Sequence, residues 1–242
     1  MRKVKVAGLA VVALLGLAGC NHDPSHAVSI GDFTVSDAQI DATADSYAAA
    51  AQEAGVDQAF VKIRESVAEY TIVKELCNRV ARNKGITVPA ADYDTTATSL
   101  GSTPDNAYVR LAAEGEGCVA ALREHMSRPP TDAELHDTYN RYKAYAGDQA
   151  STFEDIKGAL TQPDANGDTS LVDRYAQDLA VRDALVDAAN RYNLQVSPRY
   201  QPVEYPLLLV ANGALALVTL PLGQQGTGAV SPAPSPAVTP SA

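Results

Sequence analysis

Apolar residues recur at steps of three and four along most of the chain, which is the spacing of one face of an α-helix. The clearest series begins near Asp57 and ends at Gly85. Its apolar positions are Phe60, Ile63, Val67, Tyr70, Val73, Cys77 and Val80. A second long series comprises Leu171, Tyr175, Leu179, Leu185 and Tyr192. These patterns predict two long amphipathic helices, each with one apolar face.

Helix starts are marked by polar side chains that can bond to the first free backbone N–H groups. Ser36 with Gln39, and Thr131 with Glu134, have the spacing of a capping box. The first predicts a helix from Ser36 to Gly55. The second predicts a helix whose inward residues are Leu135, Tyr139 and Tyr142. Thr152 is expected to begin a further short helix that contains Phe153, Ile156 and Leu160.

Prolines and glycines predict the other helix boundaries. Pro89 is expected near the first turn of a short helix that follows Gly85. The pair Thr103-Pro104 is expected to begin the next helix. That helix should be interrupted at Gly115 and Gly117, because glycine is a poor helix former.

The ends of the predicted body have a β pattern. Residues 27–30 and 33–35 flank Gly31-Asp32, which is a hairpin signal. Near the other end, two β-type runs in "LLLVANGALALVTL" flank Asn212-Gly213, the strongest short hairpin signal. The predicted fold class is therefore mainly α, with small β pieces near both ends of the folded body.

The first 20 residues have the order of a secretory signal: a basic start, an apolar run over residues 6–17, and small residues before a cleavage site. The apolar run would span about 18 Å, which is too short for a hydrocarbon core of about 30 Å. The quartet "LAGC" resembles the bacterial lipobox, which implies that Cys20 is acylated and begins the mature protein. An ordinary secretory signal with a chance cysteine is the alternative. The expected location is extracytoplasmic, lipid-anchored to the bacterial cell membrane.

Composition divides the chain into five parts. These are a lipoprotein signal peptide (1–19), a lipidated tether (20–26), a helical body (27–200), an extended segment with a possible β-hairpin (201–223) and a Pro/Ala/Ser/Thr-rich tail (224–242) that buries too little to order itself. The leader contains three of the 19 basic residues and none of the 29 acidic ones, so the mature chain carries a net charge of −13. Such a charge repels nucleic acid and argues against it as a partner.

Two cysteines, Cys77 and Cys118, remain once Cys20 is lipidated. Outside the cytoplasm an isolated pair is more often bridged than free, so we expect a disulfide between them. Two buried free thiols that never meet are the alternative. The expected bridge would close a loop of about 40 residues.

Several segments together resemble the N-terminal domain of SurA-type and PrsA-type extracytoplasmic chaperones. "AVSIGDFTVSDAQID" is similar to that family's strand, turn, strand and first helix. "ESVAEYTIVKELCNRVARNKGITVPAADYD" is similar to its long helix and the following helix start. "PPTDAELHDTYNRY", "STFEDIKGAL" and "LQVSPRY" are similar to the elements before and after its prolyl isomerase module. The similarity covers about residues 27–200.

The isomerase module itself is missing. It needs about 90 residues between "TDAELHDTYN" and "STFEDIKGAL", where this chain has about ten. The resemblance therefore implies a chaperone-like lipoprotein that binds unfolded or exported polypeptides without catalysis. The alternative is a non-catalytic envelope scaffold for one specific partner. Neither alternative specifies an oligomeric state.

The resemblance also implies where clients bind. In that family the opening strands pair with the extended segment after the last helix, which here is residues 195–200. Such pairing would bring the first helix beside the helix of residues 171–192 and leave a groove on the open side. We expect Tyr139 and Tyr142 at the rim of this groove, because tyrosine offers apolar and hydrogen-bonding contact.

No motif in the sequence indicates a catalytic, cofactor or metal site, and we expect no enzyme activity. The histidines lack ligand partners at helical spacing. Asp164, Asn166 and Asp168 imitate a calcium loop, but Thr169 and Tyr175 stand where an EF-hand needs glycine and glutamate. This segment is therefore expected to be a solvated turn.

Overall fold

The structure is a computed structural model that describes residues 26–53, 60–200 and 203–222. The mainly α fold predicted from the sequence is confirmed. In these ranges the α-helices are α1 (Asp37–Glu53), α2 (Phe60–Lys84), α3 (Tyr93–Leu100), α4 (Ala107–His125), α5 (Asp132–Ala146), α6 (Phe153–Thr161) and α7 (Ser170–Arg191). The strands are β1 (His26–Ile30), β2 (Phe33–Ser36), β3 (Gln195–Val196), β4 (Val203–Val210) and β5 (Leu215–Leu222). Two short 3₁₀ helices are η1 (Gly147–Gln149) and η2 (Pro198–Tyr200).

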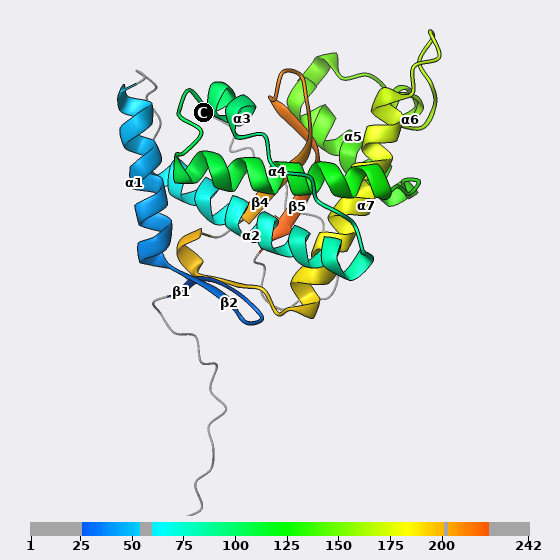
Figure 1. Cartoon of the computed structure of the whole chain (residues 1–242). Helices are drawn as coiled ribbons and strands as arrows, with labels where there is room; N and C mark the ends of the chain where they lie inside the picture. Colours follow the sequence, from blue (N-terminus) through cyan, green and yellow to red (C-terminus); the bar gives the residue numbers. More distant parts are fainter. Residues whose placement is uncertain (1–25, 54–59, 201–202, 223–242) are drawn as a thin grey trace, which may run out of the picture.

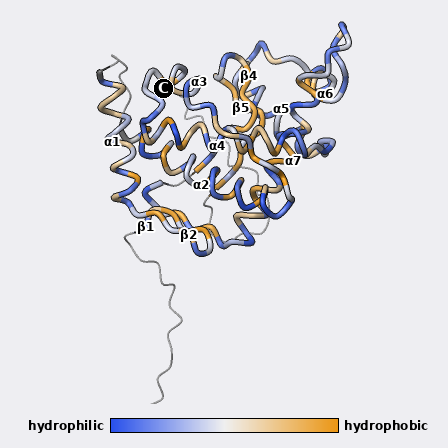
Figure 2. The backbone as a smooth tube through the Cα atoms, viewed as in Figure 1, coloured by the Kyte–Doolittle hydropathy of each residue, from blue (hydrophilic) through white to orange (hydrophobic). Residues whose placement is uncertain are grey.

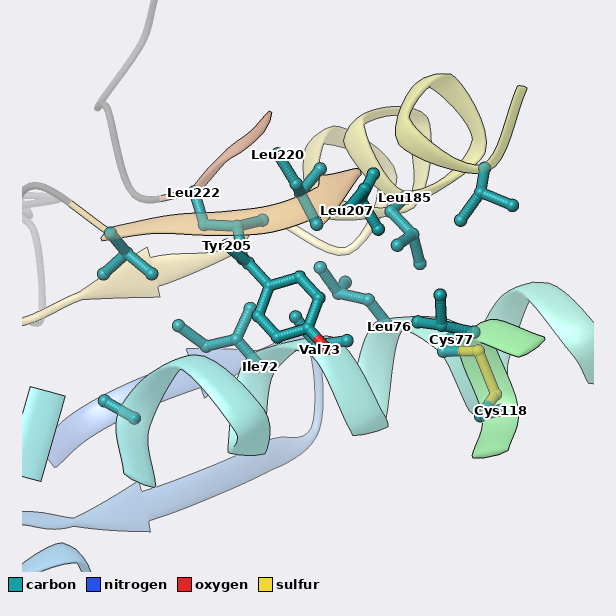
Figure 3. Packing of buried hydrophobic residues seen from close by; sticks show 14 of the residues in the cluster. Ile72, Val73, Leu76, Cys77, Cys118, Leu185, Tyr205, Leu207, Leu220 and Leu222 are labelled. Atoms are coloured by element: carbon teal, nitrogen blue, oxygen red, sulfur yellow. A yellow bond between two sulfur atoms is a disulfide. The ribbon is translucent and has the colours of Figure 1, made fainter. Parts of the chain in front are cut away.

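Helices α2 and α4 form the helical centre, and α1 packs against both (Figure 1). On the α2 face predicted from the spacing, the buried residues are Ile63, Val67, Val73, Cys77 and Val80. A disulfide between Cys77 and Cys118 joins α2 to α4, with 6.1 Å between the two Cα atoms. The predicted bridge is therefore present, and both cysteines belong to the core (Figure 3).

Helix α4 differs from the predicted helix in its start and in its continuity. It begins after Asn106, whose side chain caps it, and not at residues 103–104. It also continues through Gly115 and Gly117 without a break. A Cβ on Gly115 would lie 3.4 Å from the ring of Tyr70 on α2, which is ordinary van der Waals contact, so this part of α4 packs directly against α2. Packing between α2 and α4 therefore outweighs the poor helix propensity of glycine.

The helix expected near Pro89 begins later than predicted. Helix α3 starts at Tyr93, and residues 86–92 are not helical. Asp92 is the N-cap, and its carboxylate accepts a hydrogen bond of 2.9 Å from the N–H of Thr95. The aspartate sets the boundary because it satisfies a free N–H group, whereas a proline only tolerates the first helical turn.

The opening strands form a small antiparallel sheet in the order β2-β1-β3. Gly31, in the predicted turn between β1 and β2, has a φ of 61°, which glycine adopts without strain. Strand β1 also pairs with β3, with Val28 opposite Val196 and Ser29 opposite Gln195. The two ends of the predicted helical body therefore meet in one sheet, as the resemblance implied.

The β4–β5 hairpin lies in the core, and it is largely apolar (Figures 2 and 3). Its predicted turn is present, and Ala211, Asn212 and Gly213 all have positive φ. The buried residues of the hairpin are Val203, Tyr205, Leu207, Leu208, Leu215, Leu217, Val218, Leu220 and Leu222. Both strands contact α7, β4 also contacts α2, and β5 also contacts α5. A segment that the sequence placed outside the helical body thus belongs to the same core.

Candidate functional site

The groove expected between the first helix and the long last helix is not formed. Helices α1 and α7 do not lie side by side, because each packs against a different part of α2 (Figure 1). The β4–β5 hairpin packs against α2, α5 and α7, and it covers part of the apolar faces of α2 and α7. The physical reason is the hairpin's apolar content, because a two-stranded hairpin is stable only when its apolar face is covered.

A buried ion pair contacts the hairpin at the first of its two register shifts. The register of β4 against β5 shifts at Leu207, and a β-bulge leaves backbone groups outside the ladder. The Nη2 of Arg123 donates a hydrogen bond of 2.8 Å to the carbonyl oxygen of Leu207. Asp178 has a side chain that is 0% exposed, and it accepts hydrogen bonds from Arg123 and Arg174. Helices α4 and α7 thus satisfy a carbonyl that the sheet does not pair.

A second register shift lies at Leu217 in β5. The hydroxyl of Thr138 on α5 lies 3.5 Å from the carbonyl oxygen of Leu217 and 2.8 Å from the hydroxyl of Tyr175. Thr138 is buried, so this contact ties α5 to the hairpin. The sequence reasoning missed both anchors. The available signal was Asp178, a carboxylate at helical spacing from the apolar residues Tyr175 and Leu185.

Tyr139 and Tyr142 lie on α5, and both are half-buried. The ring of Tyr139 meets Phe153 of α6 edge-on, with 5.6 Å between the ring centroids. The hydroxyl of Tyr142 accepts a hydrogen bond of 3.2 Å from the N–H of Ser151, which joins the end of α5 to the start of α6. Hydrogen bonds from Ser151 lower the pKa of Tyr142. The two tyrosines therefore face α6, and they do not line a groove between α1 and α7.

Two further aromatic residues, His136 and Tyr145, lie on α5. His136 stacks on Phe153 with 4.0 Å between the ring centroids, and Tyr145 is 53% exposed. We call His136, Tyr139, Tyr142, Tyr145 and Phe153 the α5–α6 aromatic surface. It combines flat apolar faces with hydroxyl and imidazole groups, so it can make apolar contact and hydrogen bonds at once.

An ion-pair network fixes the start of α5 against α7. Glu134, the third residue of the α5 capping box, pairs with Arg128 and Arg182. Arg128 and Arg182 also pair with Asp183. Burial alone would raise the pKa of Glu134, but hydrogen bonds from Arg128, from the backbone of Thr131 and from Arg182 hold it well below its usual range. This network ties the start of α5, the helix that carries four of the five residues of the α5–α6 aromatic surface, to α7.

A second group of aromatic residues lies where α1, α2, α4 and β4 meet. Tyr70 contacts Tyr108 and Tyr205 edge-on, at centroid distances of 5.8 and 5.7 Å. The Tyr70 hydroxyl donates a hydrogen bond of 2.7 Å to Glu116. Burial and repulsion from Glu65 raise the pKa of the neighbouring Glu69 to about 7. Most of these rings are buried, so they contribute to packing more than to binding.

The acidic loop between α6 and α7 is a turn, as expected. Asp164 accepts hydrogen bonds from the N–H groups of Asn166 and Asp168. Asp168 in turn accepts a hydrogen bond from the N–H of Ser170 at the start of α7. An open hollow of about 530 Å³ lies beside this loop, between α6 and α7. In the described ranges no group of three or more His, Cys, Asp or Glu residues is placed to hold a metal ion.

The lipidation predicted at Cys20 lies outside the described residues. Among the helices that the structure describes, none is both long and apolar enough to cross a bilayer. Comparisons of the chain with protein-family models, with curated proteins and with solved structures found no match.

Proposed function

We propose that this chain is a membrane-anchored, extracytoplasmic, chaperone-like lipoprotein that binds unfolded or exported polypeptides without catalysis. Cys20 carries the lipid, and the helical body is the binding unit. The partners are polypeptides with exposed apolar segments, and no nucleic acid or cofactor takes part.

The arrangement of the chain ends supports this proposal. Strand β1 pairs with β3, which is the pairing that the SurA-type and PrsA-type resemblance implies. The hydroxyl of Tyr200 donates a hydrogen bond of 2.9 Å to Asp37 at the start of α1 and accepts one of 3.1 Å from Arg64. The segment after the last long helix is thus held against the start of α1.

The α5–α6 aromatic surface is the observation that carries the proposed binding activity. In the resembled family, α5 and α6 are the positions between which the isomerase module is inserted. Here a short connection joins the two helices. Tyr145, in the last turn of α5 just before this connection, is 53% exposed. Half-exposed tyrosines offer contact area at a low cost in conformational entropy, which suits loose binding of many sequences.

An aggregation assay tests the proposal. The unlipidated mature chain should suppress the aggregation of two unrelated heat-unfolded proteins at near-stoichiometric ratio. The double variant Tyr139→Ser/Tyr142→Ser and the single variant Tyr145→Ser should each suppress it less. Tyr93→Ser on α3 is the matched control, because Tyr93 is also half-buried and lies outside this surface. Equal suppression by all variants, or none by the wild-type chain, would overturn the proposal.

One observation favours a narrower function, a scaffold for a single envelope partner. Among the large apolar side chains of the described residues, only Tyr145, Leu171 and Leu209 are exposed. A general holdase needs a larger apolar surface than three separate residues provide. The same assay separates the two functions, because a scaffold would protect neither unrelated protein and would instead retain one partner.

A further inference from the structure

Most lysines and arginines in the described ranges form ion pairs with carboxylates. The exceptions there are Arg82, Lys84, Arg110, Lys143 and Arg191. Three of these five lie at the carboxyl ends of α2 and α7, and all three are exposed. We call Arg82, Lys84 and Arg191 the basic end.

A direct contact between α2 and α7 brings the basic end together. Asn83, between the two α2 cations, donates a hydrogen bond of 3.0 Å to the hydroxyl of Tyr192, which follows the α7 cation. The backbone carbonyl of Tyr192 accepts a hydrogen bond of 2.7 Å from the N–H of Gly31 in the β1–β2 turn. The basic end therefore lies beside this turn, along the lower edge of the molecule in Figure 1.

The carboxylates at this edge are mostly engaged. Asp32 and Glu75 both pair with Arg79, whose guanidinium also lies over the ring of Tyr192 at 4.4 Å. Asp187, one turn before the carboxyl end of α7, is exposed and has no ion pair among the described residues. Even with Asp187 counted, this edge carries unpaired positive charge, whereas the mature chain as a whole is strongly negative.

We propose that the basic end docks onto the headgroups of an anionic lipid bilayer. Strand β1 starts at His26 on the same lower edge (Figure 1), and five residues lie between it and Cys20, which is six residue steps. Fully extended, these residues span about 20 Å, so an anchor at Cys20 would keep this edge close to the membrane. That step rests on the proposed function. The net negative charge of the rest of the body then favours the orientation in which the basic end faces the lipid.

The docking also has a consequence for the proposed binding activity. In Figure 1 the α5 and α6 helices lie at the upper right, away from the lower edge. A body that rests on the bilayer through its basic end therefore presents the α5–α6 aromatic surface to the space outside the membrane. The anchor alone, through a short tether, would leave the orientation of the body free.

Vesicle sedimentation tests the docking without the lipid anchor. The probe is the mature chain with Cys20→Ser, which keeps every residue of the described structure, mixed with vesicles of phosphatidylcholine alone or with 30% phosphatidylglycerol. We expect binding only to the anionic vesicles, weakened by salt. The triple variant Arg82→Gln/Lys84→Gln/Arg191→Gln should weaken it at least about tenfold, because each cation near an anionic surface contributes about fivefold.

The matched control is Arg110→Gln/Lys143→Gln/Lys157→Gln, which removes the same charge from α4, α5 and α6 and should keep most of the binding. Equal losses in both triple variants, or no preference for anionic vesicles, would overturn the docking. A lower melting temperature of the first variant with unchanged vesicle binding would also overturn it, and would assign these cations to helix-end stabilisation. The aggregation assay is done without lipid, so failure of either proposal leaves the other testable.

Discussion

The β4–β5 hairpin and the α5–α6 pair are neighbours in the structure, and they differ in how they are held. Between its first and last residue the hairpin contains one charged side chain, Glu204, and most of its apolar residues are buried. The α5–α6 pair is rich in charged residues, and its aromatic residues are half-buried or exposed. In Figure 2 this appears as orange along β4 and β5 and as much blue around α5 and α6.

This difference shows why the expected groove is absent and where a binding surface remains. A client segment and the hairpin would compete for the same apolar faces of α2 and α7, and the covalently attached hairpin has the advantage of high effective concentration. The α5–α6 surface has no such competitor among the described residues. We therefore expect perturbations of the hairpin to change global stability, and perturbations of α5–α6 to change binding.

The disulfide beneath the hairpin should give the largest effect. Replacing Cys77 and Cys118 together with alanine should lower the free energy of unfolding by about 4 kcal/mol, because the bridge closes a loop with a sequence separation of 41. Denaturant unfolding of the oxidised chain and the double variant measures this. A difference below about 1 kcal/mol would mean that α2 and α4 hold together without the bridge.

The buried anchor of the hairpin should come next. Asp178→Ala should cost about 3 kcal/mol, because it leaves the largely buried Arg123 without its carboxylate. The control is Asp137→Ala on α5, whose pair with Arg141 is partly exposed and should contribute less than about 1 kcal/mol. Similar costs for the two variants in denaturant unfolding would contradict the contrast between the two regions.

The stability of the fold should depend on pH through Glu69 of α2, which is also repelled by Glu204 near the start of β4. The pKa of Glu69 is raised from 4.5 to about 7, so the folded state binds more protons than the unfolded state between these values. Stability is therefore lost as the pH rises from about 4.5 to about 7. Because Glu69 is partly exposed, the loss should be about 1 to 2 kcal/mol.

The variant Glu69→Gln isolates this effect. It should stabilise the protein at pH 8 and have little effect at pH 4, as measured by thermal unfolding across the pH range. Glu134→Gln is the opposite control, because the pKa of Glu134 is lowered by its arginine partners. Its ionised form stabilises the fold above the ordinary glutamate pKa, so this variant should destabilise at pH 7 and matter less as the pH falls. If Glu69→Gln changed the melting temperature by the same amount at every pH, the ionisation of Glu69 would have no role in stability.

The smallest effect on stability should come from the exposed end of α5. Tyr145→Ser should change the free energy of unfolding by less than about 0.5 kcal/mol, because the side chain is 53% exposed. The same variant is expected to weaken client protection in the aggregation assay. A large loss of stability would show that this part of α5 belongs to the core, and the binding surface would lose its main support.

Local features of the fold could be predicted from the sequence because they depend on neighbouring residues. The capping boxes at Ser36 and Thr131 form as expected, since each needs only a hydroxyl and an acceptor side chain three residues apart. The turns at Gly31 and Gly213 form because glycine tolerates positive φ. The sequence also predicted correctly that Tyr139 and Tyr142 lie on a helix. It did not predict which surface they face, because that depends on contacts with Phe153 of α6 and with Ser151 just before α6.

Tertiary structure decided what the local pattern left open. Helix α4 continues through Gly115 because close packing on α2 stabilises it, and no local signal contains that energy. The hairpin turn was readable in the sequence, but the place of the hairpin depends on which apolar faces of α2, α5 and α7 are left uncovered. Asp178 is buried with a charged partner because α4 brings Arg123 to it across a sequence separation of 55. The sequence thus determined the elements and their ends, while the pairing of distant apolar and charged faces determined the core and the surface that remains for binding.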